Sequence, residues 1–465
     1  MAELPNPFLV INGNRLVPWG QPAATAPVAE LADLSIPWGQ DSIVDAPKPA
    51  TMSITLRYRG SVDVLELEQG DFVDVQQIHP DGMRSPFSGR IRNMSSSLDA
   101  KGRLLIRITA TDHLADLDET YISTEWNTDG HEQAGGLTYR DRLLGALTAA
   151  GWEVTGMDLL PPELGPSSAT FYSSIKLTTL LRRYLAQWGP QASYYDASYY
   201  DVNIQRIRRR IAITYMAATA PGDALMADEA GEWFIQWGEP DPLQEIAIPA
   251  SNVLRDVAWE STPENLITVA QVSRQVTRRE ESYEGGSSYV TSLSEVNTTR
   301  GTSWINQHGR RTVEVETCTG IPSDDALHRS IGQKWMAFNG DQWRPSDVII
   351  HDSTLLSDQQ LSDLVGKTTR GRQWIVIHGV NVMTPRGARS DIRGLTTGGT
   401  LTWNHEARRW DFTMSLADTQ PTVEAGLTFA DLAAADPAYS QAPAPMAGAV
   451  QFSAFQTIST IGATA

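Results

Sequence analysis

The sequence predicts an α+β protein that is mainly β, with two small β-barrel domains, an α/β domain between them and a helical insert in the second barrel. Alternating apolar and polar residues, the pattern of half-buried strands, occur around residues 51–110 and again around 374–416. Between these stretches apolar residues recur at helical spacing, most clearly from Ile175 to Trp188. The 465 residues are also too many for one core, which indicates roughly two to four domains.

Residues 86–117, PFSGRIRNMSSSLDAKGRLLIRITATDHLADL, predict a strand, a polar turn, a second strand and a short helical turn. The first strand covers Phe87 to Met94, and the turn covers residues 95–102, whose side chains tend to bond their own backbone. One face of the second strand is apolar, with Leu104, Ile106, Ile108 and Ala110. The strand is therefore expected to be half-buried. Asp112 follows it and can cap the free amides of the helical turn.

This stretch resembles the first β-barrel domain of the tail hub proteins of long-tailed bacteriophages, which are also called baseplate hub, tail-associated or minor tail proteins. The shared pattern is an F-x-G-x-I strand, a hairpin, a strand of alternating aliphatic residues and then T-A-x-D-x-x-x-x-L. The matching residues are Phe87, Gly89, Ile91, the strand from Leu104 to Ala110, Asp112 and Leu117. The likeness of layout extends over roughly residues 36–420.

The resemblance implies a structural hub protein of the tail tip or baseplate that forms a closed ring, expected to be a homotrimer. Such a ring would join the tail tube to the tip fibres or spike and let DNA pass during ejection. The implied partners are further copies of the chain, distal tail or tail-tube proteins, the tape-measure protein, and tail fibre or receptor-binding proteins. The implied location is the tail tip of the virion, after assembly in the host cytoplasm.

The layout predicts five segments: an N-terminal arm (1–35), a first β-barrel (36–125), an α/β domain (126–248), a second β-barrel (249–420) with a helical insert (322–366), and an extended C-terminal tail (421–465). The tetrapeptide PWGQ occurs twice, at 18–21 and 37–40, and each Trp is expected to cap the end of a barrel. The C-terminal tail contains no Lys or Arg and little to build a core. It is expected to be ordered only when packed against a neighbouring subunit.

A basic run, Arg206-Ile207-Arg208-Arg209-Arg210, interrupts the α/β domain of an otherwise acidic chain. It is either a contact for nucleic acid or an acidic partner, or a solvated strand edge whose charges discourage pairing with other sheets. The strand edge is favoured, because no aromatic stacking platform is interleaved with the arginines. We also expect the channel of a ring to be acidic or neutral, with these arginines pointing away from it.

Composition and motifs argue against several classes of function. The net charge of −18 disfavours non-specific binding of nucleic acid, and the single cysteine, Cys318, permits no internal disulfide framework or cysteine-based zinc site. We expect no signal peptide, because the start MAELPNPFLV has no basic region followed by a long apolar run, and no stretch approaches the roughly 20 apolar residues of a membrane span.

Catalytic motifs are also incomplete. Gly366-Lys367-Thr368 lacks the earlier glycine of a phosphate loop, and Ser173-Ser174-Ile175-Lys176 lacks the companion motifs of acyl-enzymes. The eight histidines show no metal-binding spacing. We therefore expect no enzyme, and no catalytic, cofactor-binding or metal-binding residues.

Two alternatives to the hub remain open. One is a tail-borne carbohydrate-binding adhesin or cell-wall hydrolase, for which the only support is the content of Trp and Tyr, since aromatic residues often line sugar sites. Core packing explains these residues more simply. The other is a distal tail adaptor protein, against which the layout of two barrels with helical insertions argues.

Overall fold

A computed structural model of the chain describes residues 7–12, 14–16, 29–40, 45–58, 67–79, 82–122, 138–164, 175–201, 203–204, 206–215, 224–227, 233–236, 245–253, 259–260, 267–281, 287–299, 305–306, 309–318, 325–337, 344–345, 348–351, 356–365, 370–384, 387–405, 407 and 409–417. The expected C-terminal tail and the first PWGQ copy lie outside these residues.

The first group of strands forms a curled antiparallel sheet in the order β3-β4-β7-β6-β5-β1-β2. Its strands are β1 (Phe8–Ile11), β2 (Asn14–Leu16), β3 (Ala29–Gly39), β4 (Thr51–Tyr58), β5 (Phe72–His79), β6 (Gly82–Leu98) and β7 (Leu104–Thr111). β6 and β7 are the predicted hairpin, although β6 continues through the first half of the predicted polar turn. Ile108 and Ala110 of β7 are buried, whereas Leu104 and Ile106 are only partly buried.

The second group pairs in the order β14-β21-β22-β23-β20. Its strands are β14 (Glu245–Pro249), β20 (Val348–His351), β21 (Trp374–Thr384), β22 (Gly387–Asn404) and β23 (Arg409–Ala417). An isolated bridge between Val253 and Ile350 brings the segment after β14 back to β20. The five strands therefore curl almost into a ring. Helix α7 (Asp358–Val365), at the predicted position, packs against β14.

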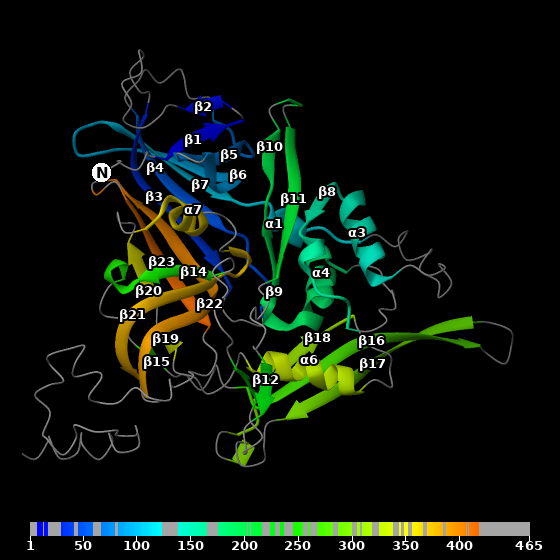
Figure 1. Cartoon of the computed structure of the whole chain (residues 1–465). Coiled ribbons are helices and arrows are strands. Elements are labelled where there is room, and N and C mark those ends of the chain that lie inside the picture. The colour runs from blue at the N-terminus through cyan, green and yellow to red at the C-terminus, as the bar shows by residue number, and fades with distance from the viewer. Residues whose placement is uncertain are drawn as a thin grey trace, which may run out of the picture.

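The two groups are one sheet, not two separate barrels. β3 pairs with β22 from Leu34 to Gly39, so that 12 strands are hydrogen-bonded together. Figure 1 shows the blue strands of the first group beside the yellow and orange strands of the second. A single hydrophobic core draws residues from both groups. The mainly β prediction is confirmed, and the structure adds a continuous connection between the two strand groups.

The β3–β22 seam contains the second PWGQ copy. Trp38 is buried beside Gly399, and Gly39 pairs with Gly398. Gly39 has a φ of +115°, and a Cβ at this position would overlap the backbone of Gly398. Glycine is therefore needed where the two strand groups meet.

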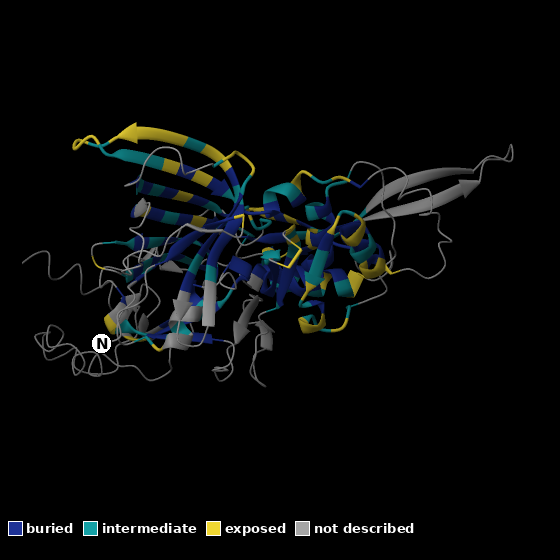
Figure 2. Ribbon diagram, turned by 90° about the horizontal axis from the view of Figure 1, so that it is seen from above, coloured by how far each residue is buried: buried dark blue, intermediate teal, exposed yellow. Residues whose placement is uncertain are grey.

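An α/β unit packs beside the main sheet. It comprises α3 (Tyr139–Ala149), β8 (Trp152–Thr155), α4 (Leu177–Leu185), β9 (Ala192–Asp196), β10 (Tyr199–Asp201) and β11 (Arg206–Tyr215). A capping box begins α3, since the amide of Asp141 donates to Thr138 Oγ1 (3.1 Å) and the amide of Thr138 donates to Asp141 Oδ2 (3.0 Å). The apolar stripe of α4 fills a separate core, and Figure 2 shows buried residues in both the main sheet and this unit.

A third unit consists of a long hairpin, a parallel strand and a helix. Its elements are β16 (Val269–Glu281), β17 (Ser287–Thr299), β18 (Thr312–Glu316) and α6 (Asp325–Ala337). These strands were expected in the second barrel but form a sheet of their own, on which α6 packs. The indole nitrogen of Trp335 donates to the carbonyl of Ala186 (3.1 Å), which ties α6 to the α/β unit.

Shorter elements complete the described structure. They are α1 (Leu114–Asp118), β12 (Ala224–Ala227), β13 (Trp233–Gln236), β15 (Trp259–Glu260), β19 (Arg344–Pro345) and the 3₁₀ turns Met157–Leu159, Ala186–Gln191 and Ala250–Asn252. Within the described residues no helix is long and apolar enough to cross a membrane.

Gly89 of the predicted F-x-G-x-I strand lies where β6 passes closest to the end of β7. A Cβ at Gly89 would overlap the carbonyl oxygen of Thr111 and lie 2.8 Å from the ring of Phe87. The glycine of this pattern is thus required by strand packing.

Replacing Gly89 by alanine should destabilise the protein by about 3 kcal/mol, because β6 and β7 must move apart. The change Gly102→Ala is the control: nothing lies within 4 Å of its Cβ position, and its φ of +74° should cost only about 1 kcal/mol. Chemical denaturation followed by far-UV circular dichroism measures both. Equal losses for the two variants would show that Gly89 is not held by packing.

Candidate functional site

The residues that match the hub pattern lie in the core, not on a binding surface. Phe87, Ile91 and Leu117 are each 0% exposed. Phe87 and Ile91 pack in the core of the main sheet, and Leu117 of α1 packs in the core of the α/β unit. The pattern therefore reflects packing, and the candidate functional residues lie elsewhere.

Asp112 is the polar member of this pattern and is buried. Its carboxylate accepts hydrogen bonds from the amide of Ala50 (2.9 Å) and the amide of Leu114 (3.1 Å). The predicted capping role of Asp112 is confirmed, because Leu114 begins α1. The same side chain also ties the segment before β4 to the end of β7.

A second buried carboxylate, Asp196 at the end of β9, connects the α/β unit to the main sheet. It accepts from the amide of His113 (3.0 Å) and from the amide of Ser198 (2.9 Å). In return, Ser88 Oγ of β6 donates to the carbonyl of Ser198 (2.9 Å). The two units are thus joined by charge-assisted and neutral hydrogen bonds shielded from water.

Arg370, just before β21, supplies positive charge at the same place. Its guanidinium donates to the carbonyl of Pro86 and lies 6.0 Å from the centre of the Phe87 ring. Burial lowers the pKa of Arg370 to about 10, and the charges of Asp112 and Asp196 oppose that shift. We call Asp112, Asp196 and Arg370 the buried junction, since it joins the first strand group, the α/β unit and the second strand group.

The backbone on either side of Arg370 is held by the α/β unit. Arg372, with a φ of +66°, donates to the carbonyl of Pro190, and burial lowers its pKa to about 9. Gly371 packs against Tyr195 and accepts a hydrogen bond from Thr214 through its carbonyl. This segment therefore enters β21 in a fixed position.

A separate cluster of arginines surrounds Asp116 of α1. Arg90 and Arg92 of β6 approach its carboxylate at 3.8 and 3.3 Å, and Arg209 of β11 at 3.9 Å. Burial alone would raise the pKa of Asp116, but the hydrogen bond with His113 and the charges of Arg90 and Arg209 outweigh it and hold the pKa below its usual range. One carboxylate thus faces three guanidinium groups.

The basic run lies on β11, which is an edge strand only in part, because among the described strands Arg206 to Arg208 pair with β10 alone, whereas β8 flanks β11 from Arg209 on. β11 pairs with β10 through Arg206 to Arg208, with β8 through Arg209 to Ala212, and with β9 beyond. Arg208 and Arg210 form ion pairs with Glu153, at 3.7 and 2.7 Å. Arg208 also lies 3.5 Å from Asp201, so these two arginines are paired with two carboxylates within the α/β unit.

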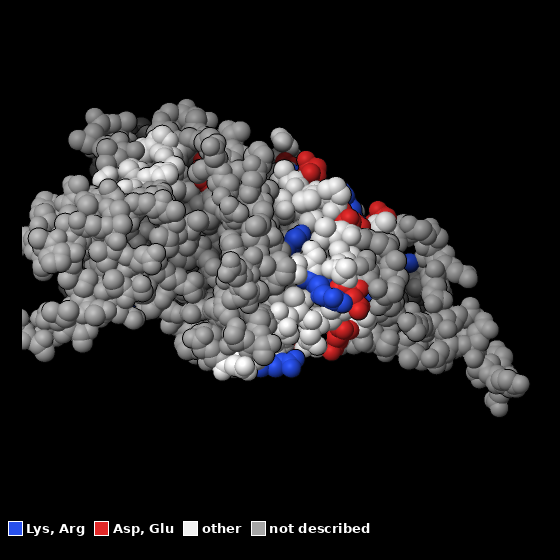
Figure 3. All heavy atoms as spheres, turned by 60° about the horizontal axis from the view of Figure 1, so that its bottom comes forward, with Lys and Arg blue, Asp and Glu red and all other residues white. Residues whose placement is uncertain are grey.

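Arg206 and Arg209 instead face an open groove of about 750 Å³ between the main sheet and β11. The groove is lined by Asn12, Gly70, Phe72, Arg90, Gly151, Tyr200, Arg206, Ile207 and Arg209. We call it the arginine groove. The face shown in Figure 3 differs from it, because the described basic and acidic side chains there lie interspersed.

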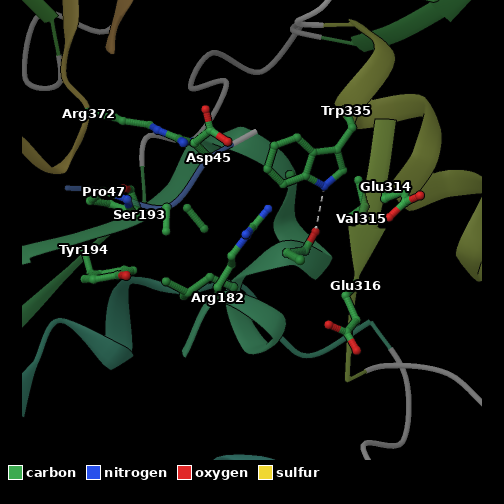
Figure 4. Close-up of a pocket in the computed structure, with 15 residues that line it drawn as sticks. Asp45, Pro47, Arg182, Ser193, Tyr194, Glu314, Val315, Glu316, Trp335 and Arg372 are labelled. Atoms are coloured by element: carbon green, nitrogen blue, oxygen red, sulfur yellow. Dashed lines mark hydrogen bonds between the residues drawn. The ribbon is translucent and has the colours of Figure 1, made fainter. Parts of the chain in front are cut away.

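A smaller cavity lies between the α/β unit and β18 (Figure 4). Arg182, Tyr194, Glu316, Trp335 and Arg372 are among its lining residues. Its enclosed volume of about 40 Å³ has room for a few water molecules, whereas pockets for small molecules usually measure about 300–1,000 Å³. The cavity is too small for a metabolite.

The geometry of the described residues gives no support to the metal-binding and catalytic sites that the sequence argued against. Within the described residues no three His, Cys, Asp or Glu side chains are grouped to hold a metal. Burial raises the pKa of the Cys318 thiol far above its usual range, and Lys176 binds Asp118 at 3.2 Å. Ser173, Ser174 and residues 366–368 lie outside the described residues.

Sequence reasoning missed Arg370, Arg372 and Asp196, and did not connect Arg209 with Asp116. The available signal was local: Arg370-Gly371-Arg372 stands directly before an apolar strand, where charges need an explanation. The hydrogen-bond partners of these three residues are 157 to 284 positions away in the chain and could not be found from spacing.

No protein-family model and no curated protein sequence matches the chain. Among solved structures, it is similar to the 43 kDa tail protein of prophage MuSo2 from Shewanella oneidensis, with 10% identity, 88% of this chain and 98% of that chain covered, and a TM-score of 0.45. A tail protein from Neisseria meningitidis MC58 gives 9% identity, 89% and 96% coverage, and a TM-score of 0.45.

A third similar structure is a component of the type VI secretion system of Escherichia coli, itself described as similar to bacteriophage T4 tail proteins gp27 and gp5. It is 12% identical, with 89% of this chain and 79% of that chain covered and a TM-score of 0.37. The chain is thus structurally similar to phage and prophage tail proteins over about nine-tenths of its length.

The change Arg370→Ala should destabilise the protein by about 3–5 kcal/mol, because Asp112 and Asp196 lose the buried positive charge near them. The control is Arg107→Ala on the exposed side of β7, which should change stability by no more than about 0.5 kcal/mol. Chemical denaturation measures both variants. If Arg370→Ala lowers the free energy of unfolding no more than Arg107→Ala does, the buried junction does not stabilise the protein.

The change Asp116→Asn should cost about 1–2 kcal/mol at pH 7, because three arginines then face one another. Since the folded pKa of Asp116 lies below its unfolded value of about 4, its stabilisation is present above pH 4 and is lost as the pH falls through the folded pKa. The difference between wild type and variant should therefore shrink below pH 4. Asp325→Asn, in an exposed pair with Arg329, is the control and should show little difference at either pH.

Proposed function

We propose that the chain is a structural hub protein of a phage tail tip or baseplate, and that it has no catalytic activity. The observation that carries the proposal is the continuous sheet of 12 strands, in which β3 and β22 connect the motif-bearing group to the second group. Each copy is a rigid block with two curled strand groups, a form suited to building a closed wall from few subunits.

In the proposed ring, three copies place six strand groups around the channel, and the two groups of each copy alternate. The strands of the second group nearly close on themselves, which supports the prediction that this group is a barrel. The first group curls without closing on itself, and its β3 edge is covered by β22 of the same chain. At its other end, β1 is the only described strand that pairs with β2. In the ring a neighbour covers that end, which would otherwise invite aggregation.

The proposed partners are distal tail or tail-tube proteins, tail fibre or receptor-binding proteins, and the tape-measure protein, with DNA passing only in transit. A channel wall that repels or ignores phosphates suits this transit, because each cationic contact would hold DNA more tightly. Arg208 and Arg210 are paired with Glu153, and this pairing supports a channel wall that does not include these two arginines. The proposed location is the tail tip of the virion.

The alternative of a sugar-binding adhesin or cell-wall hydrolase has no observation in its favour. Its support was the content of aromatic residues, but the largest fully buried side chains include Trp152, Trp188, Trp374, Trp403 and Trp410. These indoles pack in the cores and are not available to stack on a carbohydrate.

Particles that contain the chain provide the test. Gold-labelled antibody against it should mark one end of the tail, and native mass spectrometry of detached tail tips should give a complex with three times the mass of one chain. Antibody against the tube protein is the control and should mark the tail shaft. Label along the shaft, or tail tips that release only single copies of the chain, would contradict the proposal.

A further inference from the structure

The arginine groove carries an excess of positive charge in a chain with a net charge of −18. Arg90, Arg206 and Arg209 line it, and Arg92 lies beside Arg90 on the Asp116 carboxylate. Arg206 is exposed and forms no ion pair with a described residue. The guanidinium groups around Asp116 are about one-third exposed, at 31% for Arg90 and 33% for Arg209. The groove therefore presents positively charged side chains to solvent.

The carboxylates near the groove do not balance this charge. Asp116 is shared among three arginines. Asp71, next to Gly70, is held by the side chain of Asn12 (2.8 Å) and the amide of Glu68 (2.8 Å). Asp201, the register partner of Arg206, already pairs with Arg208 at 3.5 Å. Four guanidinium groups thus face Asp71, the shared Asp116 and the shared Asp201, and the surplus positive charge can be neutralised by an anionic partner.

The aromatic residues of the groove make a single nucleic-acid strand a poor occupant. Phe72 is buried and stacks on both Tyr200 (5.7 Å between ring centres) and His113 (6.0 Å). Proteins that bind single strands offer exposed aromatic faces on which successive bases stack. Here Phe72 is already covered, so the groove offers charge without a row of open aromatic faces.

The chain itself contains a complementary segment. Residues 418–436 contain four acidic residues, Asp418, Glu424, Asp431 and Asp436, and no Lys or Arg follows as far as residue 465. The segment continues from β23, whose last residue, Ala417, pairs with Leu395. Leu395 pairs in turn with Trp374, two residues after Arg372. The segment therefore starts from the end of the sheet that lies at the buried junction, and when extended it spans about 60 Å.

We propose that the arginine groove binds the acidic segment 418–436 of this chain. The contact is electrostatic: carboxylates of the segment lie among Arg206, Arg209 and Arg90, and add to the charge that Asp116 supplies from within. The interaction weakens with salt, because the groove is open to solvent. The inference does not depend on the proposed function, since it concerns two parts of one sequence.

Zero-length cross-linking of the full-length protein tests the contact. The variant Arg206→Lys keeps the positive charge and adds an amine, which a carbodiimide joins to a neighbouring carboxylate as an amide with loss of water. We expect peptides from 418–436 to be linked to position 206, and their yield to fall at least about fivefold at 1 M salt. Asp201, the register partner of position 206, serves as an internal positive control.

The matched control is Arg107→Lys, an exposed position on β7 outside the groove. Mixing ¹⁴N- and ¹⁵N-labelled chains shows whether the linked segment comes from the same or a neighbouring copy, and either result supports the proposal. Cross-links from position 206 to Asp201 alone, or equal links from position 107 to the segment, would overturn it.

Discussion

The buried junction of Asp112, Asp196 and Arg370 is the interaction on which the rest of the structure depends. Each of these groups is costly to bury alone. Backbone amides donate to the two carboxylates, Arg370 donates to the carbonyl of Pro86, and the negative charges of Asp112 and Asp196 favour the charged form of Arg370. They come from the end of β7, the end of β9 and the start of β21. A charge network of this kind fixes the position of three units relative to one another more specifically than apolar contacts can, because its hydrogen bonds depend on direction.

The junction and the β3–β22 seam together make one body from segments that are far apart in the sequence. The seam joins the two strand groups through backbone hydrogen bonds and facing glycines. The junction adds the α/β unit, and Trp335 connects that unit to α6. These contacts hold the strand groups, the α/β unit and α6 in one arrangement. Such an arrangement suits the wall of a tail tip and gives the proposed hub a physical basis.

Much of the local structure could be predicted from the sequence, whereas the long-range contacts could not. The β6–β7 hairpin, the Thr138 capping box, the stripe of α4 and helix α7 follow from periodicity and capping, which depend on neighbours in the chain. The merging of two strand groups depends on Gly39 meeting Gly398, and no local signal marks that pair. Likewise Arg206 to Arg210 suggest an edge strand by composition, but β8, β9 and β10 provide partners that only the fold reveals.

The central claim is that the chain forms the wall of a ring at the tail tip, and a cryo-electron microscopy reconstruction of that tip tests it most directly. The account predicts three copies around the channel, with the two strand groups of each copy alternating and with the β2 end of each sheet covered by a neighbour. It also predicts that Arg206 to Arg210 lie off the channel surface. Copies attached singly to the outside of the tip, or a channel wall lined by these arginines, would contradict it.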